Sequence, residues 1–305
     1  MHAIYQLRSS RYLQIRTHAC VLMVLLSFVV PARPAQREIE NLLRPEYEKK
    51  VLILRHFYAD SKLRFDKDGK LLGDARRGYS TSDSMVYIDN LSIDKHGALS
   101  LKGRRILNIF DDKTGRFSNI GTKEGIQISV ELDSTWQDAS QVRVLLDRVF
   151  ATDIRQTTEE IPKFLQCWQY GNAERKEDGR WHCPSRKKDV PIARIADSEP
   201  KYTMTDGRRV FYVLGGGVTA PIKVLSPAPR YADLAKKMGI QGATLLDVII
   251  NERGEASVID ILRPLGGGLD DKAIETLETW QFKPATYNGE PVAVHVNIET
   301  KFALY

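Results

Sequence analysis

The sequence predicts an α+β fold: a mainly β region with one helix, followed by a small two-layer α+β unit. Short apolar runs separated by Asp- and Gly-rich turns fill the chain from Val51 to about Leu132, which is typical of antiparallel sheets or small barrels. Apolar residues at helical spacing follow, from Val142 to Val149, and predict one helix. Residues 221–305 then follow the order helix, strand, strand, helix, strand, which favours a two-layer unit.

Composition places the chain among ordinary globular proteins. Its 305 residues suffice for about two domains. Hydrophobic residues make up 42% and charged residues 28%, a balance that argues against a largely disordered chain. The formal charge is +6, but the basic residues alternate with acidic ones and form no long stripe. The sequence therefore predicts no nucleic-acid binding.

The first 35 residues have the pattern of a signal peptide. Arginines before residue 17 precede an apolar core from Ala19 to Val30, and small residues follow, with cleavage expected after Ala32. The core is shorter than the about 20 residues that span a membrane. We therefore expect an exported, periplasmic protein. An uncleaved anchor in the inner membrane is the alternative.

Two cysteines remain if that segment is removed. Cys167 and Cys183 form an even pair, and in an oxidising compartment such a pair predicts a disulfide. A metal site that also used His182 lacks a fourth ligand at a suitable spacing. The sequence therefore predicts a disulfide and no metal.

We expect the β-rich domain to span residues 45–155, after a charged lead-in over residues 36–50. Its strands are predicted near 50–57, 63–65, 85–88, 91–93, 99–101, 106–110 and 126–132, and Asp138 is placed to cap its single helix. Residues 156–220 are more polar and predict an irregular connector that holds the disulfide. Within the connector, Phe211 to Leu214 form one further candidate strand.

Residues 221–305 predict the clearest elements. A short helix, Tyr231 to Met238, precedes a hairpin of Ala243–Ile250 and Ala256–Leu262. A second helix starts near Asp270, and a final strand runs from Val292. A hairpin plus one strand predicts a three-stranded antiparallel sheet with two free edges.

The final strand alternates strictly between apolar and polar residues. From Val292 to Leu304, the even positions are apolar apart from Thr300, and the odd positions are mostly polar. This pattern predicts a strand that packs on helices with one face only.

These elements carry a specific set of short motifs. They are Ser226-Pro227-Ala228-Pro229-Arg230-Tyr231, Gly239-Ile240-Gln241-Gly242, the turn Asn251–Gly254, Leu262-Arg263-Pro264-Leu265, Gly268-Leu269-Asp270, Trp280-Gln281-Phe282-Lys283-Pro284-Ala285 and Asn288-Gly289-Glu290-Pro291-Val292. In this combination, residues 221–305 resemble the C-terminal domain of the TonB energy-transducer family.

The resemblance implies a binding module without a cofactor that engages a protein through a sheet edge. In this family a strand of the partner adds to the sheet, so main-chain hydrogen bonds supply affinity and alternate side chains supply selectivity. The partner would be a TonB-dependent outer-membrane receptor or a second copy of the chain. Carried onto this sequence, the expected binding residues are Val292, Val294, His295, Val296, Asn297, Ile298, Glu299, Thr300, Lys301 and Phe302.

The chain also departs from the family pattern. Gln281 stands where the family usually has Arg, and the 13 prolines form no rich spacer. Force transduction through a membrane anchor is therefore an alternative function. A secreted enzyme in the β-rich region is a remote one, because the six histidines are dispersed and show no nucleophile–base spacing.

Overall fold

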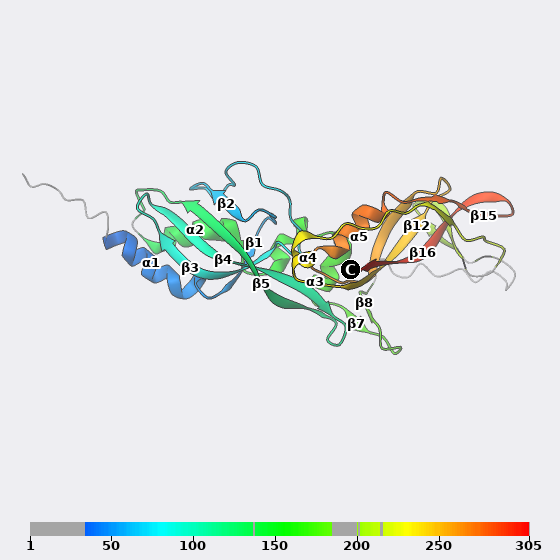
Figure 1. Ribbon diagram of the computed structural model, residues 1–305, viewed down its shortest axis with the longest axis horizontal. Coiled ribbons are helices and arrows are strands. Elements are labelled where there is room, and N and C mark those ends of the chain that lie inside the picture. The colour runs from blue at the N-terminus through cyan, green and yellow to red at the C-terminus, as the bar shows by residue number, and fades with distance from the viewer. Residues whose placement is uncertain (1–33, 137, 185–199, 201, 214–215, 305) are drawn as a thin grey trace, which may run out of the picture. The chain divides into compact units, whose positions relative to one another are not determined.

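The computed structural model describes residues 34–136, 138–184, 200, 202–213 and 216–304. These residues belong to one compact unit, Arg33–Tyr305 (Figure 1). The predicted signal segment lies outside the described residues, apart from its last two positions. In the described part of the chain, no helix is long and apolar enough to cross a membrane.

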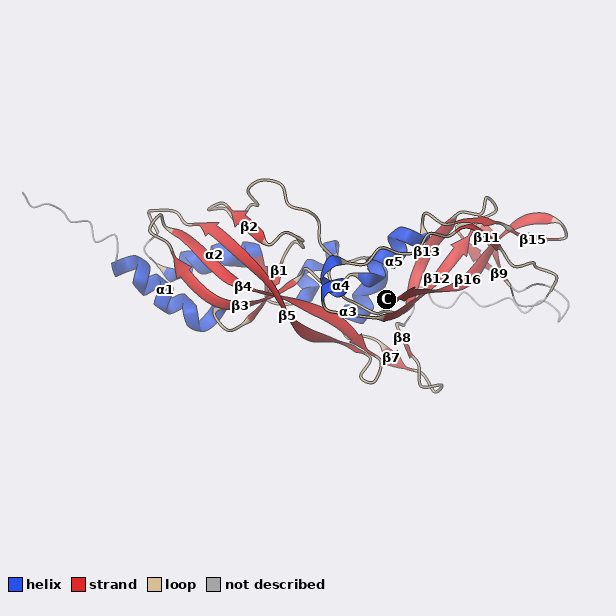
Figure 2. Cartoon of the chain, in the orientation of Figure 1, coloured by secondary structure: helices blue, strands red, loops and turns tan. Residues whose placement is uncertain are grey.

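A six-stranded sheet contains the strands of the predicted β-rich region, in the order β2-β5-β4-β3-β1-β6 (Figure 2). All its pairings are antiparallel except that between β2 and β5. The longest pairing joins β4 to β5, from Ala98↔Glu131 to Asp111↔Arg116. The strands are β1 (Val51–Leu54), β2 (Lys62–Phe65), β3 (Met85–Ile93), β4 (Ala98–Asp111), β5 (Arg116–Glu131) and β6 (Phe150–Ala151).

Two helices, rather than the one expected, pack on this sheet. The predicted helix is α2 (Ala139–Val149), and Asp138 caps it by accepting the Ser140 N–H at 2.9 Å. The other is α1 (Pro34–Tyr47), where we expected a charged lead-in. Its Ile39 and Leu43 are one turn apart and buried in the same core as α2. The prediction of a lead-in was wrong, because it gave the charged composition and Pro45 more weight than the helical spacing of Ile39, Leu43 and Tyr47.

The second sheet has six strands. Five follow in the order β13-β12-β16-β10-β9, and the sixth, β15 (Ala285–Tyr287), pairs with β16 off this path. The predicted three-stranded antiparallel sheet is therefore not confirmed, because β10 and β9 extend it and β10 runs parallel to β16. Val210 and Phe211 of β10 are buried, and this burial favours the added strand. The other five strands are β9 (Tyr202–Thr205), β10 (Arg208–Tyr212), β12 (Gly242–Ile250), β13 (Ala256–Arg263) and β16 (Glu290–Phe302).

Helices and short strands complete a second hydrophobic core around this sheet. Leu269, Ala273 and Leu277 form the buried face of α5 and join the sheet residues Leu246, Val248 and Ile298 in one cluster. The remaining elements of this half are β11 (Ile222–Leu225), α4 (Asp233–Lys237), α5 (Leu269–Leu277) and β14 (Gln281–Lys283).

The loop before α5 docks on strand β4 through its main chain. Phe110 N–H donates to Leu265 O at 3.0 Å, and Gly267 N–H donates to Asn108 O at 2.9 Å. Gly266 has φ +90°, and a Cβ there would lie 2.2 Å from Asn108 O. Glycine is thus required for both backbone conformation and close approach.

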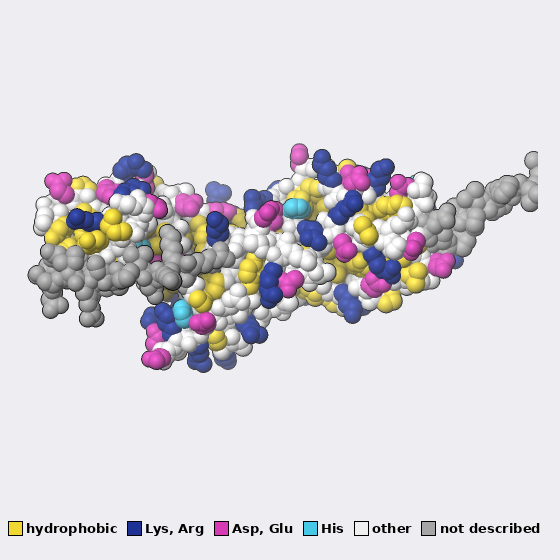
Figure 3. Space-filling view, turned by 180° about the vertical axis from the view of Figure 1, so that it is seen from behind, with side chains coloured by type: hydrophobic (Ala, Val, Ile, Leu, Met, Phe, Trp, Pro, Cys, Tyr) yellow, Lys and Arg dark blue, Asp and Glu magenta, His cyan; other side chains and the backbone are white. Residues whose placement is uncertain are grey.

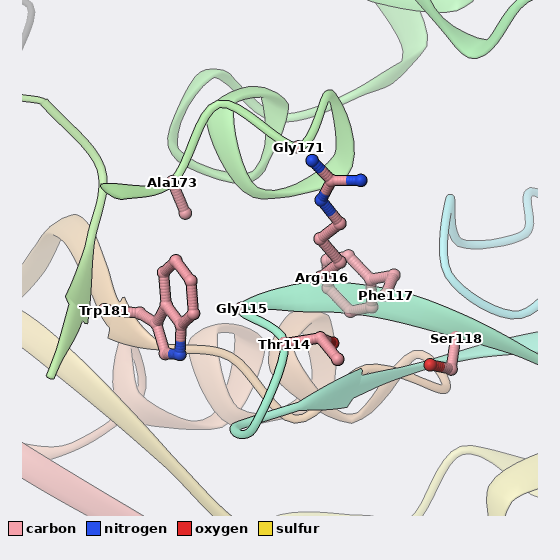
Figure 4. Close-up of a pocket in the computed structure, with 8 residues that line it drawn as sticks. All are labelled: Thr114, Gly115, Arg116, Phe117, Ser118, Gly171, Ala173 and Trp181. Atoms are coloured by element: carbon pink, nitrogen blue, oxygen red, sulfur yellow. The ribbon is translucent and has the colours of Figure 1, made fainter. Parts of the chain in front are cut away.

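The predicted connector contains the disulfide Cys167–Cys183, which joins residues 16 apart in the sequence. The disulfide closes the loop between the two cysteines, and this loop contacts the turn between β4 and β5. There Trp181 Nε1 donates to Asp112 O at 2.7 Å, and the indole lies beside Gly115 (Figure 4). The elements of this region are η1 (Ile154–Glu160), α3 (Lys163–Gln169), β7 (Glu174–Arg175) and β8 (Trp181–His182).

Removal of this disulfide is expected to destabilise the protein. In the chain-entropy model, a loop of this length contributes about 3 kcal/mol, so Cys183→Ser should lower the urea midpoint and speed proteolysis between Gly171 and His182. Native protein treated with a reductant should behave like the variant, whereas the variant should not respond to the reductant. Equal urea midpoints and cleavage rates with and without the bond would contradict the prediction.

Candidate partner-binding strand

Strand β16 forms as its alternating sequence predicts. On the even positions, Val294, Ile298, Thr300 and Phe302 are buried and Val292 and Val296 are half-buried. On the odd positions, Asn297, Glu299 and Lys301 are exposed. Side chains of successive strand residues point to opposite faces, so the buried set packs on the helices and the exposed set faces solvent.

One side of β16 is paired along most of its length. Antiparallel pairing with β12 runs from Ile250↔Val294 to Gly242↔Phe302. Before it, Val292 pairs with Ala285 of β15 in a hairpin. Asn288 (φ 50°) and Gly289 (φ 86°) form the tip of that hairpin, as expected of an Asn-Gly turn.

The other side of β16 is partly occupied by β10. Val210, Phe211 and Tyr212 pair in parallel with Ala293, Val294 and His295. The prediction that the final strand leaves a whole edge bare is therefore wrong for Val294 and His295. The apolar side chains of Val210 and Phe211 enter the core, and their burial stabilises the pairing.

Aromatic and polar contacts fix β10 at this position. The His295 ring stacks on Tyr212, with centroids 4.9 Å apart and an interplanar angle of 11°. His295 Nε2 lies 3.1 Å from Thr203 Oγ1 on β9, and Nδ1 lies 3.7 Å from Asp247 Oδ1 on β12. His295 thus contacts three strands, and its expected role facing an incoming strand is not what the structure shows for its side chain.

The sequence offered no basis for including Thr203 and Tyr212 in the site. Both lie in the predicted connector, about 80 to 90 positions before their partners in β16. Only the short run Phe211 to Leu214 suggested a strand there, and it carried no information about its neighbour.

Beyond His295, the free side of β16 begins. In the described part of the chain, no strand pairs with residues 296–302 on the side opposite β12. These seven residues extend over about 23 Å. Their exposed face carries Asn297, Glu299 and Lys301, and Glu299 forms an ion pair with Arg263 at 2.9 Å. The predicted binding residues from Val296 to Phe302 therefore lie on the part of β16 that has a strand partner on one side only, among the described residues.

The opposite end of the sheet is protected. At edge strand β13, Ile261 O accepts the indole N–H of Trp168 at 2.9 Å, and Ile261 N–H donates to Asp260 Oδ1 at 2.8 Å. Both main-chain groups of Ile261 are thus satisfied by side chains, which blunts an edge against strand addition. Ile261 is thus protected on β13, whereas residues 296–302 of β16 have no strand partner opposite β12 in the described part of the chain.

Trp280 and Phe282 lie at the base of the domain, as expected, and both are largely buried. Trp280 Nε1 donates to Pro227 O at 3.0 Å, and the Lys223 ammonium lies 4.5 Å from the indole centroid. This contact joins β11 to the start of β14. Both side chains support the sheet and take no part in its free edge.

Two adjacent carboxyl groups begin α5. Asp270 is fully buried and accepts the Leu265 and Gly266 N–H groups at 2.8 and 2.7 Å. Asp271 Oδ2 is buried without a hydrogen-bond partner in the described structure. Burial, reinforced by the charge of Asp270, raises the pKa of Asp271 from 3.8 to about 8.

This shift makes stability fall as pH rises. Between about pH 4 and pH 8 the unfolded state ionises Asp271 while the folded state keeps its proton, so unfolding releases a proton. Asp271→Asn should therefore show a smaller fall in melting temperature between pH 5 and pH 8 than the native protein. Glu278→Gln, at the exposed end of the helix, serves as the control. Parallel pH profiles for Asp271→Asn and the native protein would contradict the prediction.

No metal-binding cluster is found among the described residues. They contain no group of three or more His, Cys, Asp or Glu placed to hold a metal ion. Basic and acidic side chains are interspersed over the face seen in Figure 3, in keeping with the mixed charge of the sequence. Along residues 296–302, β16 offers main-chain donors and acceptors on the side opposite β12.

Comparisons with known proteins match the C-terminal part of the chain. Residues 227–304 fit the family model described as Gram-negative bacterial TonB protein C-terminal. The chain is 33% identical over 97 residues to Protein TonB of Vibrio cholerae, and 28% identical over 92 residues to Protein TonB of Xanthomonas campestris. These matches cover 29% and 30% of this chain but only 40% and 41% of the relatives.

A solved structure covers a similar share of the chain. The solution NMR structure of the Pseudomonas aeruginosa TonB CTD is 20% identical, with a TM-score of 0.22, and covers 29% of this chain and 90% of that one. The family model and the curated relatives together show that residues 227–304 are a TonB C-terminal domain.

Proposed function

We propose that this TonB C-terminal domain binds a partner protein by accepting one of its strands along residues 296–302. The observation that carries the proposal is a difference between two strands: the main chain of Ile261 on edge strand β13 is satisfied by side chains, whereas residues 296–302 of β16 have no strand partner opposite β12 among the described residues. An unpaired strand supplies main-chain donors and acceptors in register, and strand addition is a common mode of peptide recognition.

The proposed setting is the periplasm, and the proposed partner is an outer-membrane receptor in TonB-dependent transport. The relatives bear the name Protein TonB, and the predicted signal segment and the disulfide Cys167–Cys183 fit an exported protein. On this proposal the chain works as a non-enzymatic binding module. The predicted boundaries of the β-rich domain, the connector and the C-terminal domain, at residues 45, 156 and 221, stay predictions.

The experiment is amide hydrogen exchange on the purified chain, with a synthetic peptide of the box segment of a TonB-dependent receptor. Residues 296–302 should gain protection when the peptide binds, because their outward N–H groups acquire acceptors. A peptide with prolines at alternate positions lacks the required N–H groups and is the control. Protection confined to β9, or no protection at all, would refute the proposed site.

Anchored energy transduction is the second candidate, because the relatives are named TonB and the chain has an apolar N-terminal stretch. It requires Met1 to Ala35 to be retained in membrane fractions. A mature N-terminus near Arg33 would exclude it and would leave the binding module as the function.

A further inference from the structure

A cavity of about 540 Å³ is lined by residues outside β16. Its walls come from residues 59–61 and 76–83, from β4 and β5, and from the segment around α4. Cavities of this size hold small molecules. The cavity contains none of the residues proposed to bind a strand.

The lining has more positive than negative charge. It contains six Arg or Lys side chains and four Asp or Glu side chains. Two of the cations are paired within the cavity: Arg76 Nε lies 3.0 Å from Asp60 Oδ1, and Lys237 Nζ lies 2.9 Å from Glu124 Oε1. The other four cations form no ion pair with an acidic side chain of the lining in the described structure.

Arg230 and Arg77 provide charge that a ligand can reach. In the described structure, the Arg230 side chain has no hydrogen bond or ion pair. Arg77 is largely exposed, and its nearest carboxylate, Glu160, is 3.8 Å away. Both guanidinium groups therefore retain donors for a ligand.

Arg105 places a buried charge in the wall of the cavity. Its side chain is 4% exposed, and its guanidinium donates to the carbonyl oxygens of Asp83 and Asp60 at 2.8 and 2.9 Å. No carboxylate lies within ion-pair distance in the described structure. Carbonyl oxygens satisfy the donors of Arg105 but do not neutralise its charge.

Burial of the Arg105 charge is costly; Asp83 and Asp60 offset part of this cost from beyond ion-pair distance, and an anion in the cavity would reduce it further. Guanidinium groups match carboxylate and phosphate oxygens in a planar, two-point geometry. The acidic side chains of the lining, among them Asp83 and Asp233, would repel a ligand with several negative charges. We infer that this cavity binds a small molecule through one phosphate or carboxylate group, held by Arg77, Arg105 and Arg230.

The test is an NMR titration of the purified chain with inorganic phosphate and, separately, with acetate, at constant ionic strength. The backbone amides of Gly125 and Ala232 line the cavity and should shift saturably with one of the two anions. The anion that binds more tightly identifies the recognised group. Loss of one charged hydrogen bond should weaken binding about tenfold in Arg230→Gln and in Arg77→Gln.

Arg208→Gln removes the same charge from an exposed site outside the lining and should leave the affinity unchanged. Melting curves check that each variant folds. Shifts that never saturate, or affinities equal in all three variants and the native protein, would overturn the inference. Edge protection by a receptor peptide is measured separately, so either result can fail without the other.

Discussion

Proline at Val296 or at Asn297, two neighbouring positions of β16, is expected to weaken strand addition strongly at one of the two positions and to leave the fold intact there. Successive N–H groups in a strand point to opposite sides, so one of these two faces β12 and the other faces the free edge. Proline removes the N–H and places its ring there. The outward variant should bind the receptor peptide about tenfold to a hundredfold more weakly.

The inward variant provides the internal comparison. It removes a donor that pairs with β12 and should lower the melting temperature, whereas the outward variant should melt close to the native protein. Asn297→Ala keeps the backbone donor and should bind normally, which separates main-chain from side-chain effects. Strand addition at residues 296–302 is refuted if both proline variants fold and bind the peptide with native affinity.

Trp168→Ala is expected to cause the largest loss of stability. Trp168 is 1% exposed, packs edge-on against Phe110 with centroids 5.2 Å apart, and donates to Ile261 O. Truncation of a buried tryptophan typically costs about 3–5 kcal/mol. Urea unfolding should show a loss of this size in the free energy of unfolding.

The matched control is Trp168→Phe, which keeps an aromatic ring but leaves Ile261 O without its donor. Its cost should be smaller, about 1–3 kcal/mol. Because the β13 edge is then uncapped, both variants should also self-associate more readily in sedimentation experiments. A loss below about 1 kcal/mol for the alanine variant would show that Trp168 does not hold α3 to the sheet.

Local patterns were sufficient to predict several elements correctly. The alternation in β16 predicted its buried and exposed faces because strand side chains have a strict period of two. Asp138 predicted the start of α2 because a capping carboxylate accepts a main-chain N–H from the first turn of the helix that follows it. Cys167 and Cys183 could be paired because, in an exported protein, no other cysteine remained.

Non-local pairing could not be predicted in the same way. Three residues of β10 join β16 in parallel, and nothing within either segment specifies the other. As a result, the candidate site was predicted too long at its start, where Val294 and His295 are covered. The segment from Val296 to Phe302 lies on β16 beyond the pairing with β10, and its binding role stays a prediction.

The central position of β16 has a consequence for folding kinetics. Its partners β12 and β10 are distant in sequence, so the sheet has a high contact order. The entropy cost of closing the long intervening loops precedes the favourable free energy of strand pairing. Residues 296–302 therefore form a paired strand with one free side only after β16 has joined β12 and β10. A partner that recognises this edge would therefore select fully folded chains over folding intermediates, without any separate checkpoint.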